Sequence, residues 1–336
     1  MLEKPDLEDD KIINCLQQEY GLPVAGITFL PLGADRNTAV YRATTYDETA
    51  YFVKLRRGNF DESAVAVPKY LSALGIKQII PSLTTQTGQL WADLPSFKAI
   101  LYPYVAGHDG YERPLTDQQW AEFGTALKQF HTAVIPPTIT RGIKRESFSP
   151  RWRNTVKLFL ERIEQEKFAE PAAAEMAAFL RSKQAETLAL VQRTEQLAQS
   201  LQAQPPEFIL CHADIHAWNL LITDDGALYM VDWDTLIFAP KERDLMFVGG
   251  GLGGNGHTPQ EEETLFYQGY GRAEINPIAL AYYRYERIIE DIAVFCQQIL
   301  LSDEGGEDRP QAVEYLKSNF RPNGTIAVSS QSDQVQ

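Results

Sequence analysis

The stretch of sequence that decides the fold lies between residues 212 and 234. Residues 212–219 read His-Ala-Asp-Ile-His-Ala-Trp-Asn, and residues 231–234 read Val-Asp-Trp-Asp. Asp214 therefore stands five residues before Asn219 and eighteen before Asp232. Two of these side chains are carboxylates and one is an amide, so each offers an oxygen to a hydroxyl proton or to a hard cation such as Mg²⁺. The alternative is a surface loop with scattered acids.

A short β-hairpin is expected between the two motifs. Residues 220–222 and 227–231 are apolar, and residues 224–226 between them read Asp-Asp-Gly, which is typical of a tight turn. The hairpin would separate the first polar motif from the second.

This order of groups is the one that phosphate transfer from ATP requires. The reaction needs a carboxylate that orients and deprotonates the attacking hydroxyl, and two oxygen ligands that hold Mg²⁺ on the phosphates. Protein kinases supply them from a loop with Asp and then Asn, and from an Asp after the next hairpin. The spacing of Asp214, Asn219 and Asp232 fits this arrangement and predicts ATP and Mg²⁺ as cofactors.

Composition sets broad limits on the class of protein. The 336 residues, 44% of them hydrophobic, are enough for two lobes with a sizeable core. No apolar run of about 18 residues predicts a membrane span, and the start lacks a signal-peptide pattern. Three widely spaced cysteines indicate reduced thiols and a cytoplasmic location. A net charge of −14 argues against nucleic acid or an anionic membrane as partner and favours cationic ligands, although it also serves solubility.

The order of expected elements predicts an α+β fold with two lobes. Residues 1–104 read as a small β-rich nucleotide-binding lobe, residues 105–320 as a large, mainly helical catalytic and substrate-binding lobe, and residues 321–336 as a loose tail. Strands are predicted over residues 26–32, 39–44, 51–55, 77–84, 88–93 and 98–104. Helices are predicted over residues 7–20, 61–74, 149–168, 171–202 and 278–301, with another beginning at Thr116.

Lys54 is the expected phosphate-binding lysine of the first lobe. It lies among the apolar residues 51–55, and burying a charge there is unfavourable unless the charge is paired. In kinase-like lobes a lysine at this place grips the phosphates. Its expected partner is Glu62, at the start of the next helix, with Asp61 as the rival. The alternative is an exposed lysine on an edge strand.

Two further segments of the first lobe are expected to contact the nucleotide. Residues 33–38, Gly-Ala-Asp-Arg-Asn-Thr, lie between two strands and would cover the phosphates through backbone N–H groups and the Asn37 side chain, or else form an ordinary hairpin turn. Residues 100–107 would connect the lobes and bind adenine through the Pro103 carbonyl and the Val105 N–H, or else form a plain strand and loop.

Two other motifs resemble known sites less well. Residues 251–258 imitate a phosphate-binding loop, but His257 stands where the lysine should be. A zinc hydrolase site leaves Asn219 and Asp232 unexplained. Its ligands would come from one short stretch: Cys211, His212, Asp214 and His216.

The two motifs together resemble the aminoglycoside phosphotransferase family, whose members have the protein-kinase fold but act on small molecules. In that family the Asp-Phe-Gly of protein kinases is replaced by Asp, an aromatic residue and an acid, as at residues 232–234. Residues 149–153, 242–251 and 282–293 are similar to the spectinomycin phosphotransferase subgroup. The resemblance covers about residues 10–320.

The resemblance implies a protein-kinase-like bilobal fold and transfer of the ATP γ-phosphate to a hydroxyl of a cationic aminocyclitol such as spectinomycin, which would give antibiotic resistance. It implies Asp214 as the catalytic base and Asn219 and Asp232 as the Mg²⁺ ligands. Lys54 would bind phosphate, and Asp244 would brace the catalytic loop by hydrogen bonds.

A substrate that carries ammonium groups calls for carboxylates and aromatic rings in its pocket. The helix expected over residues 278–301 offers Glu286, Glu290 and Asp291, and an earlier helix offers Trp152. The alternatives are ion pairs of these acids with Arg287 along one helix face, and a core position for Trp152.

Two other functions compete with this one. A kinase of a metabolite such as choline, a sugar or an amino-alcohol would share the ATP site, because substrate pockets diverge while that site persists. A pseudokinase that only binds nucleotide is disfavoured by the presence together of Lys54, Asp214, Asn219 and Asp232.

Overall fold

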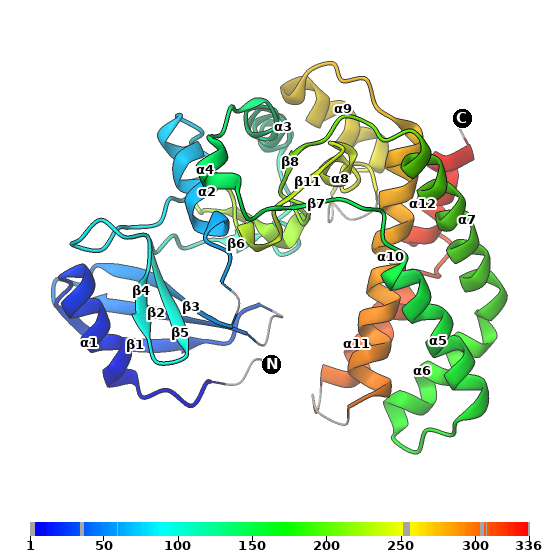
Figure 1. The fold of residues 1–336 in the computed structure, drawn as a ribbon, viewed down its shortest axis with the longest axis horizontal. Coiled ribbons are helices and arrows are strands. Elements are labelled where there is room, and N and C mark those ends of the chain that lie inside the picture. Colours follow the sequence, from blue (N-terminus) through cyan, green and yellow to red (C-terminus); the bar gives the residue numbers. More distant parts are fainter. Residues whose placement is uncertain are drawn as a thin grey trace. The chain divides into compact units, whose positions relative to one another are not determined.

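The computed structural model has the predicted α+β fold and divides into two compact units (Figure 1). The first unit consists of residues 1–143 and 218–236, and the second of residues 144–217 and 237–336. The residues described are 4–33, 37–58, 60–250, 256–302, 306 and 308–334. This division differs from the predicted one, because the segments 105–143 and 218–236 belong to the first unit. None of the described helices is long and apolar enough to cross a membrane.

An antiparallel five-stranded sheet forms the base of the first unit. Its order is β1-β2-β3-β5-β4, with β3 in the centre. Alternate residues of β2 and β3, such as Tyr41 and Val53, are fully buried in the core against helix α1. The bounds are α1 Asp9–Tyr20, β1 Val24–Leu30, β2 Thr38–Thr45, β3 Ala50–Arg57, β4 Ala92–Leu94 and β5 Phe97–Pro103. The strand predicted over residues 77–84 does not form; Ile79 makes only an isolated bridge to Met230.

The predicted hairpin between the two motifs is confirmed. Strands β9 (Leu220–Ile222) and β10 (Leu228–Met230) pair antiparallel, and Gly226 adopts a left-handed φ of 88° in their turn. Strand β6 (His108–Asp109) completes a three-stranded sheet. The helices of this unit are α2 (Ser63–Ala73), α3 (Asp117–Thr132) and α4 (Pro137–Thr140), and α3 begins with the predicted capping box of Thr116 and Gln119.

The second unit is built around helix α10 (Pro277–Leu300), which packs against the helices that surround it. Because it is surrounded, even its charged residues Arg284 and Glu286 are buried. The surrounding helices are α5 (Arg151–Gln165), α6 (Pro171–Ser182), α7 (Gln184–Ala203), α8 (Glu242–Leu245), α11 (Asp308–Ser318) and α12 (Thr325–Gln334). The unit also holds α9 (Pro259–Tyr270) and a small sheet of β7 (Lys144–Arg145), β11 (Ile237–Ala239) and β8 (Ile209–Cys211).

The tail predicted to be loose is a helix. Helix α12 packs on α10, and Asp333 accepts hydrogen bonds from Arg193 of α7 at 2.7 and 2.8 Å and from the Tyr285 hydroxyl at 3.2 Å. The sequence of α12 is polar, so its stability comes from tertiary contacts that composition does not reveal.

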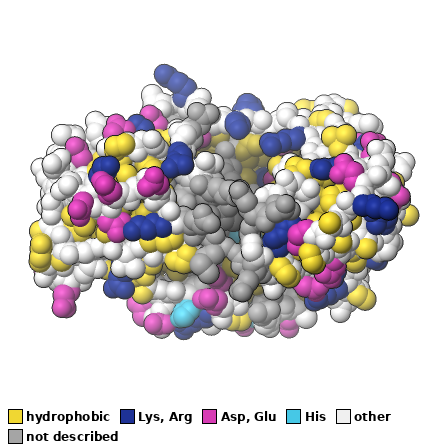
Figure 2. Space-filling view, turned by 90° about the horizontal axis from the view of Figure 1, so that it is seen from below, with side chains coloured by type: hydrophobic (Ala, Val, Ile, Leu, Met, Phe, Trp, Pro, Cys, Tyr) yellow, Lys and Arg dark blue, Asp and Glu magenta, His cyan; other side chains and the backbone are white. Residues whose placement is uncertain are grey.

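The surface carries charges of both signs. On the face drawn in Figure 2, acidic and basic side chains alternate among the described residues and form no large patch of one sign. This face therefore shows no concentration of the excess negative charge that the net charge of −14 implies.

Candidate active site

Lys54 lies at the centre of a charged cluster in the first unit. It belongs to β3, the central strand of the sheet, so the alternative of an edge-strand lysine is wrong. Its Nζ atom lies 2.9 Å from Oδ1 of Asp232 and 2.8 Å from Oδ2 of Asp234, and the side chain is 14% exposed. Burial opposes the positive charge, but the two carboxylates outweigh it and raise the pKa of Lys54 above its ordinary value.

The predicted partner of this lysine, Glu62, is not the partner found. Glu62 is exposed and occupies the N-cap position of α2, and the structure pairs Lys54 with Asp232 and Asp234 instead. The link from β3 to α2 is short, so Glu62 stands before the first helical turn and not on the helix face.

The two acids of this cluster are held by the tryptophan between them. Trp233 is buried, donates its indole N–H to the carbonyl of Met230 at 3.1 Å, and packs edge-on against Phe130. Asp232 adopts a left-handed φ of 61°, a conformation that is unfavourable for a residue with a side chain and that surrounding contacts must hold.

Asn219 and Asp232 flank the same, open end of the hairpin, since Asn219 precedes β9 and Asp232 follows β10. The Asn219 carbonyl accepts the N–H of Val231 at 3.0 Å, which ties the start of β9 to the residue before Asp232. Asn219 is 9% exposed and Asp232 is 51% exposed. An amide and a carboxylate are the oxygen donors that Mg²⁺ prefers, so the donor set fits the predicted metal.

The other predicted nucleotide contacts lie around the same sheet. Pro103 ends β5, Val105 follows it in a loop, and the carbonyl of Asn37 accepts the N–H of Arg57 at 2.8 Å. Residues 34–36 of the phosphate-covering loop and residues 251–255 of the glycine segment lie outside the described residues. The roles given to these residues stay predictions.

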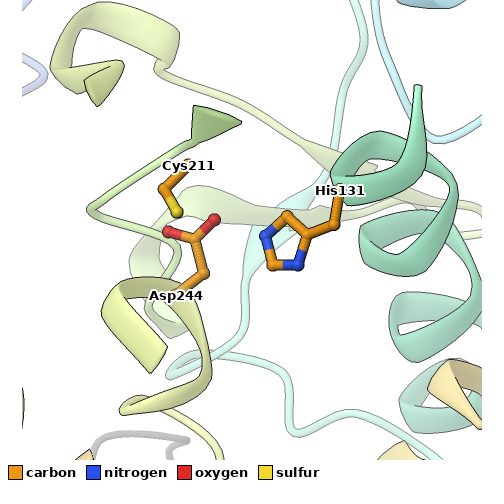
Figure 3. Close-up of side chains that lie close together, drawn as sticks. All are labelled: His131, Cys211 and Asp244. Atoms are coloured by element: carbon orange, nitrogen blue, oxygen red, sulfur yellow. The ribbon is translucent and has the colours of Figure 1, made fainter. Parts of the chain in front are cut away.

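In the second unit, Asp244 braces the loop that carries Asp214, as predicted. Its carboxylate accepts the backbone N–H groups of His212 at 2.9 Å and Ala213 at 2.6 Å. Figure 3 shows Asp244 on α8 pointing toward Cys211 at the end of β8. Ala213 has a left-handed φ of 71°, so the buried carboxylate holds a backbone turn that alanine disfavours.

The Asp214 carboxylate meets two basic side chains. Its Oδ1 atom lies 2.5 Å from Nη1 of Arg287 and 3.4 Å from Nε2 of His216. Burial alone would raise the pKa of Asp214, but the His216 hydrogen bond and the Arg287 charge outweigh it and hold this pKa well below its usual range. Asp214 is therefore ionised throughout the neutral range.

Comparison with known proteins shows the family of the chain that carries these two charge clusters. Residues 28–286 match the phosphotransferase enzyme family. The chain belongs to this family. This is the family of aminoglycoside phosphotransferases. The predicted kinase-like α+β fold and the predicted phosphotransferase class are therefore confirmed.

Solved structures show how far the likeness of this phosphotransferase extends. Spectinomycin phosphotransferase APH(9)-Ia in complex with ADP and spectinomycin is 35% identical, with a TM-score of 0.90 over 98% of this chain and 100% of that one. The AMP-bound complex gives 34% identity and a TM-score of 0.85 over 96% and 98%. Choline kinase LicA from Streptococcus pneumoniae, 15% identical with a TM-score of 0.56 over 96% and 99%, shares the fold alone. No curated protein sequence matched the chain.

The predicted substrate contacts of the phosphotransferase fall into three different environments. Glu286 is 6% exposed and forms a buried ion pair with Arg153 at 3.4 Å, so it faces the core of the second unit. Asp291 accepts a hydrogen bond from Arg287 at 3.1 Å, as the ion-pair alternative expected. Glu290 and Trp152 are half-buried, and the Arg151 guanidinium stacks 4.4 Å over the Trp152 ring.

Sequence reasoning missed Arg56 and the contact of Arg287 with Asp214 in the phosphotransferase site. Arg56 follows Lys54 by two residues on the same face of β3 and reaches Asp234 at 3.2 Å; strand alternation was a signal that pointed to it. Arg287 reaches Asp214 across 73 positions of sequence, and only its spacing of four from Asp291 was visible beforehand.

Proposed function

We propose that this phosphotransferase transfers the γ-phosphate of ATP to a hydroxyl of spectinomycin or a closely related cationic aminocyclitol. The observation that carries the proposal is the likeness over nearly the whole chain to APH(9)-Ia, whose solved complex contains ADP and spectinomycin. The charge clusters at Lys54 and Asp214 supply the groups that this reaction needs. Action in the cytoplasm, where ATP is available, completes the proposal.

The first unit is proposed to bind the nucleotide. Lys54 presents a positive charge to the phosphate oxygens, and the neighbouring Asp232 and Asp234 hold its ammonium group in place. Asn219 and Asp232 would hold Mg²⁺, which when bound neutralises charge on the phosphates. The remaining proposed nucleotide contacts are Asn37, Pro103 and Val105.

The second unit is proposed to act on the acceptor. Asp214 accepts a hydrogen bond from the substrate hydroxyl and orients its oxygen toward the γ-phosphorus. As the new O–P bond forms, the bond from the γ-phosphorus to the β–γ bridging oxygen breaks, the hydroxyl proton passes to the Asp214 carboxylate, and ADP leaves. A carboxylate with a lowered pKa is a weak base, so its main contribution is orientation, and the proton moves late.

Recognition of the substrate's ammonium groups is proposed to depend on acids that remain accessible. Glu290 meets this condition, because it is half-buried and Glu286 is enclosed with Arg153. Asp291 is already bonded to Arg287. Of the three predicted acids, Glu290 is therefore the strongest choice for a substrate contact.

The test is an assay of the purified protein with ATP, Mg²⁺ and spectinomycin, with the product's mass recorded. We expect spectinomycin to gain one phosphoryl group in step with ADP formation. Choline assayed in parallel tests the metabolite-kinase alternative, and the Asp214→Asn variant shows whether turnover belongs to this site. Unmodified spectinomycin beside a phosphorylated choline would overturn the proposed substrate.

A further inference from the structure

We propose that Arg287 is a positioning residue of the phosphotransferase: it holds the carboxylate of Asp214 in one orientation, and Asp291 in turn holds Arg287. The inference rests on the proposed function, in which Asp214 is the base that receives the acceptor's proton.

The contacts form a continuous chain from helix α10 to the catalytic loop. Arg287 donates from Nε to Oδ1 of Asp291 at 3.1 Å and from Nη1 to Oδ1 of Asp214 at 2.5 Å. The two hydrogen bonds use different nitrogens, Nε and Nη1, of the same planar group. Together they fix the orientation of the guanidinium plane. A guanidinium has this rigid fork, whereas a lysine ammonium acts as a point charge.

The aromatic ring of Phe247 packs against both basic partners of Asp214. The Arg287 guanidinium lies 5.8 Å from the ring centroid of Phe247, and the imidazole of His216 lies 5.8 Å from the same ring in an edge-on arrangement. Phe247 is 3% exposed. The two basic partners of Asp214 therefore share one buried support, which restricts their motion.

The catalytic loop is therefore held both by its backbone and by one of its side chains. Asp244 fixes its backbone through the N–H groups of His212 and Ala213, and Arg287 fixes the carboxylate of Asp214 itself. An ion pair that only stabilised α10 would need Asp291 alone, four residues further along the helix. The bond to a residue 73 positions away gives Arg287 a second task.

Charge adds to the geometric argument. Among the described residues, the titratable groups that act on Asp214, Arg287 and Asp291 also include His216 from the loop and Glu290 from α10. Burial raises the pKa of Asp291 to about 6 against the opposing effect of Arg287. Without Arg287, Asp214 would keep the effect of burial and the His216 hydrogen bond but lose the guanidinium charge, so its pKa would rise.

The test compares Arg287→Lys with Arg287→Met across pH. We expect Arg287→Met to lower kcat by on the order of 10²-fold, because the carboxylate loses its orientation. The acid limb of its pH profile should move up by about 1–3 pH units, because no charge replaces the guanidinium. Arg287→Lys should keep the acid limb near that of the wild type and still lower kcat. Asp291→Asn should lower kcat less than either.

Controls separate this role from simple support of the fold. Arg162→Gln removes a partly exposed arginine of the same unit, whose partner is Glu166 four residues away, and should leave kcat and its pH profile unchanged. The KM for ATP and the unfolding temperature should stay near wild type in Arg287→Lys. Arg287→Met with a wild-type kcat and acid limb would overturn the proposal. If Arg287→Met does not fold, equal kcat values in Arg287→Lys and the wild type would overturn it.

A second measurement keeps this proposal separate from the choice of substrate. In protein carrying ¹³C-labelled aspartate carboxyls, the NMR signal of Asp214 is the one that Asp214→Asn removes. Its titration should lie at higher pH in Arg287→Met than in the wild type, whether or not spectinomycin is phosphorylated. A signal that titrates identically in both proteins would refute the role of Arg287, whereas a wild-type enzyme that leaves spectinomycin intact would refute only the substrate.

Discussion

The two charge clusters of the phosphotransferase hold their acids in different ways. In the first unit, Lys54 on the central strand bridges Asp232 and Asp234, and Asp232 stays 51% exposed. In the second unit, Arg287 on the central helix bridges Asp291 and Asp214, whose side chain is 25% exposed. In each unit a cation on a rigid element holds an acid on irregular backbone.

The difference in exposure corresponds to the proposed tasks. An acid that binds Mg²⁺ must exchange a protein cation for a metal ion, which favours a solvent-accessible carboxylate held by a flexible lysine. An acid that receives a proton must keep one orientation, which favours a fixed guanidinium. Both clusters also contain a left-handed residue with a side chain, Asp232 and Ala213, each of which stores on the order of 1–3 kcal/mol of strain.

The largest expected effect comes from breaking the second cluster at its acid. Asp214→Asn should lower kcat by roughly 10²–10⁴-fold, because the amide cannot take up the hydroxyl proton. ADP affinity, measured by calorimetry, should stay close to wild type, because the proposed nucleotide residues belong to the first unit. A variant with nearly normal turnover would remove Asp214 from the mechanism.

The next effect comes from breaking the first cluster at its cation. Lys54→Met leaves Asp232 and Asp234 without their lysine and removes a charge from the phosphates, so kcat/KM for ATP should fall by roughly 10²–10³-fold. Steady-state kinetics with varied ATP check this. Lys157→Met, which removes a surface pair with Glu195, is the matched control and should behave like the wild type. Equal losses in the two variants would contradict the assignment.

A smaller effect distinguishes the two acids of the first cluster. Asp232→Asn should raise the Mg²⁺ concentration for half-maximal activity by about tenfold or more, since even loss of groups outside the ligand set weakens metal binding 10–100-fold. Asp234→Asn should shift it less, because Asp234 is shared between Lys54 and Arg56. Titrations of activity with Mg²⁺ at saturating ATP compare the two variants. A larger shift in Asp234→Asn than in Asp232→Asn would make Asp234 the ligand.

The fold was predictable because its signals are local. The spacing of Asp214, Asn219 and Asp232 and the turn between residues 222 and 227 all lie within a short stretch, and Lys54 stands out as one charge in an apolar strand. The brace at Asp244 followed from the resemblance to the family and is confirmed.

The partners of the site residues were less predictable because they depend on packing between distant segments. Lys54 was expected to pair with Glu62, eight residues away, and instead pairs with acids about 180 positions later. Glu286 was a candidate substrate contact because a substrate with ammonium groups calls for carboxylates, yet α10 is enclosed by other helices and Glu286 is enclosed with it. No local pattern encodes such long-range placement.

The smallest expected effect concerns the buried pair of Glu286 and Arg153, which belongs to neither charge cluster and serves as a reference. Burial raises the pKa of Glu286 to about 7, against the opposing charge of Arg153. The folded state therefore holds a proton that the unfolded chain releases above its ordinary pKa of 4.5, so this group's contribution to stability falls as pH rises from about 4.5 to 7. Glu286→Gln removes this titration, and its urea midpoint should fall less between pH 5 and 8 than that of the wild type. If the urea midpoint fell equally between pH 5 and 8 in the variant and the wild type, Glu286 would not titrate in this pH range.

Helix α12 has a practical consequence for anyone who trims this protein. Its polar sequence invites removal of everything after residue 320, yet Asp333 ties it to α7 and α10, the helix that carries Arg287. A shortened chain would expose the face of α10 that α12 covers, and such surface promotes aggregation. Poor solubility or low activity of a trimmed protein would then reflect the missing helix.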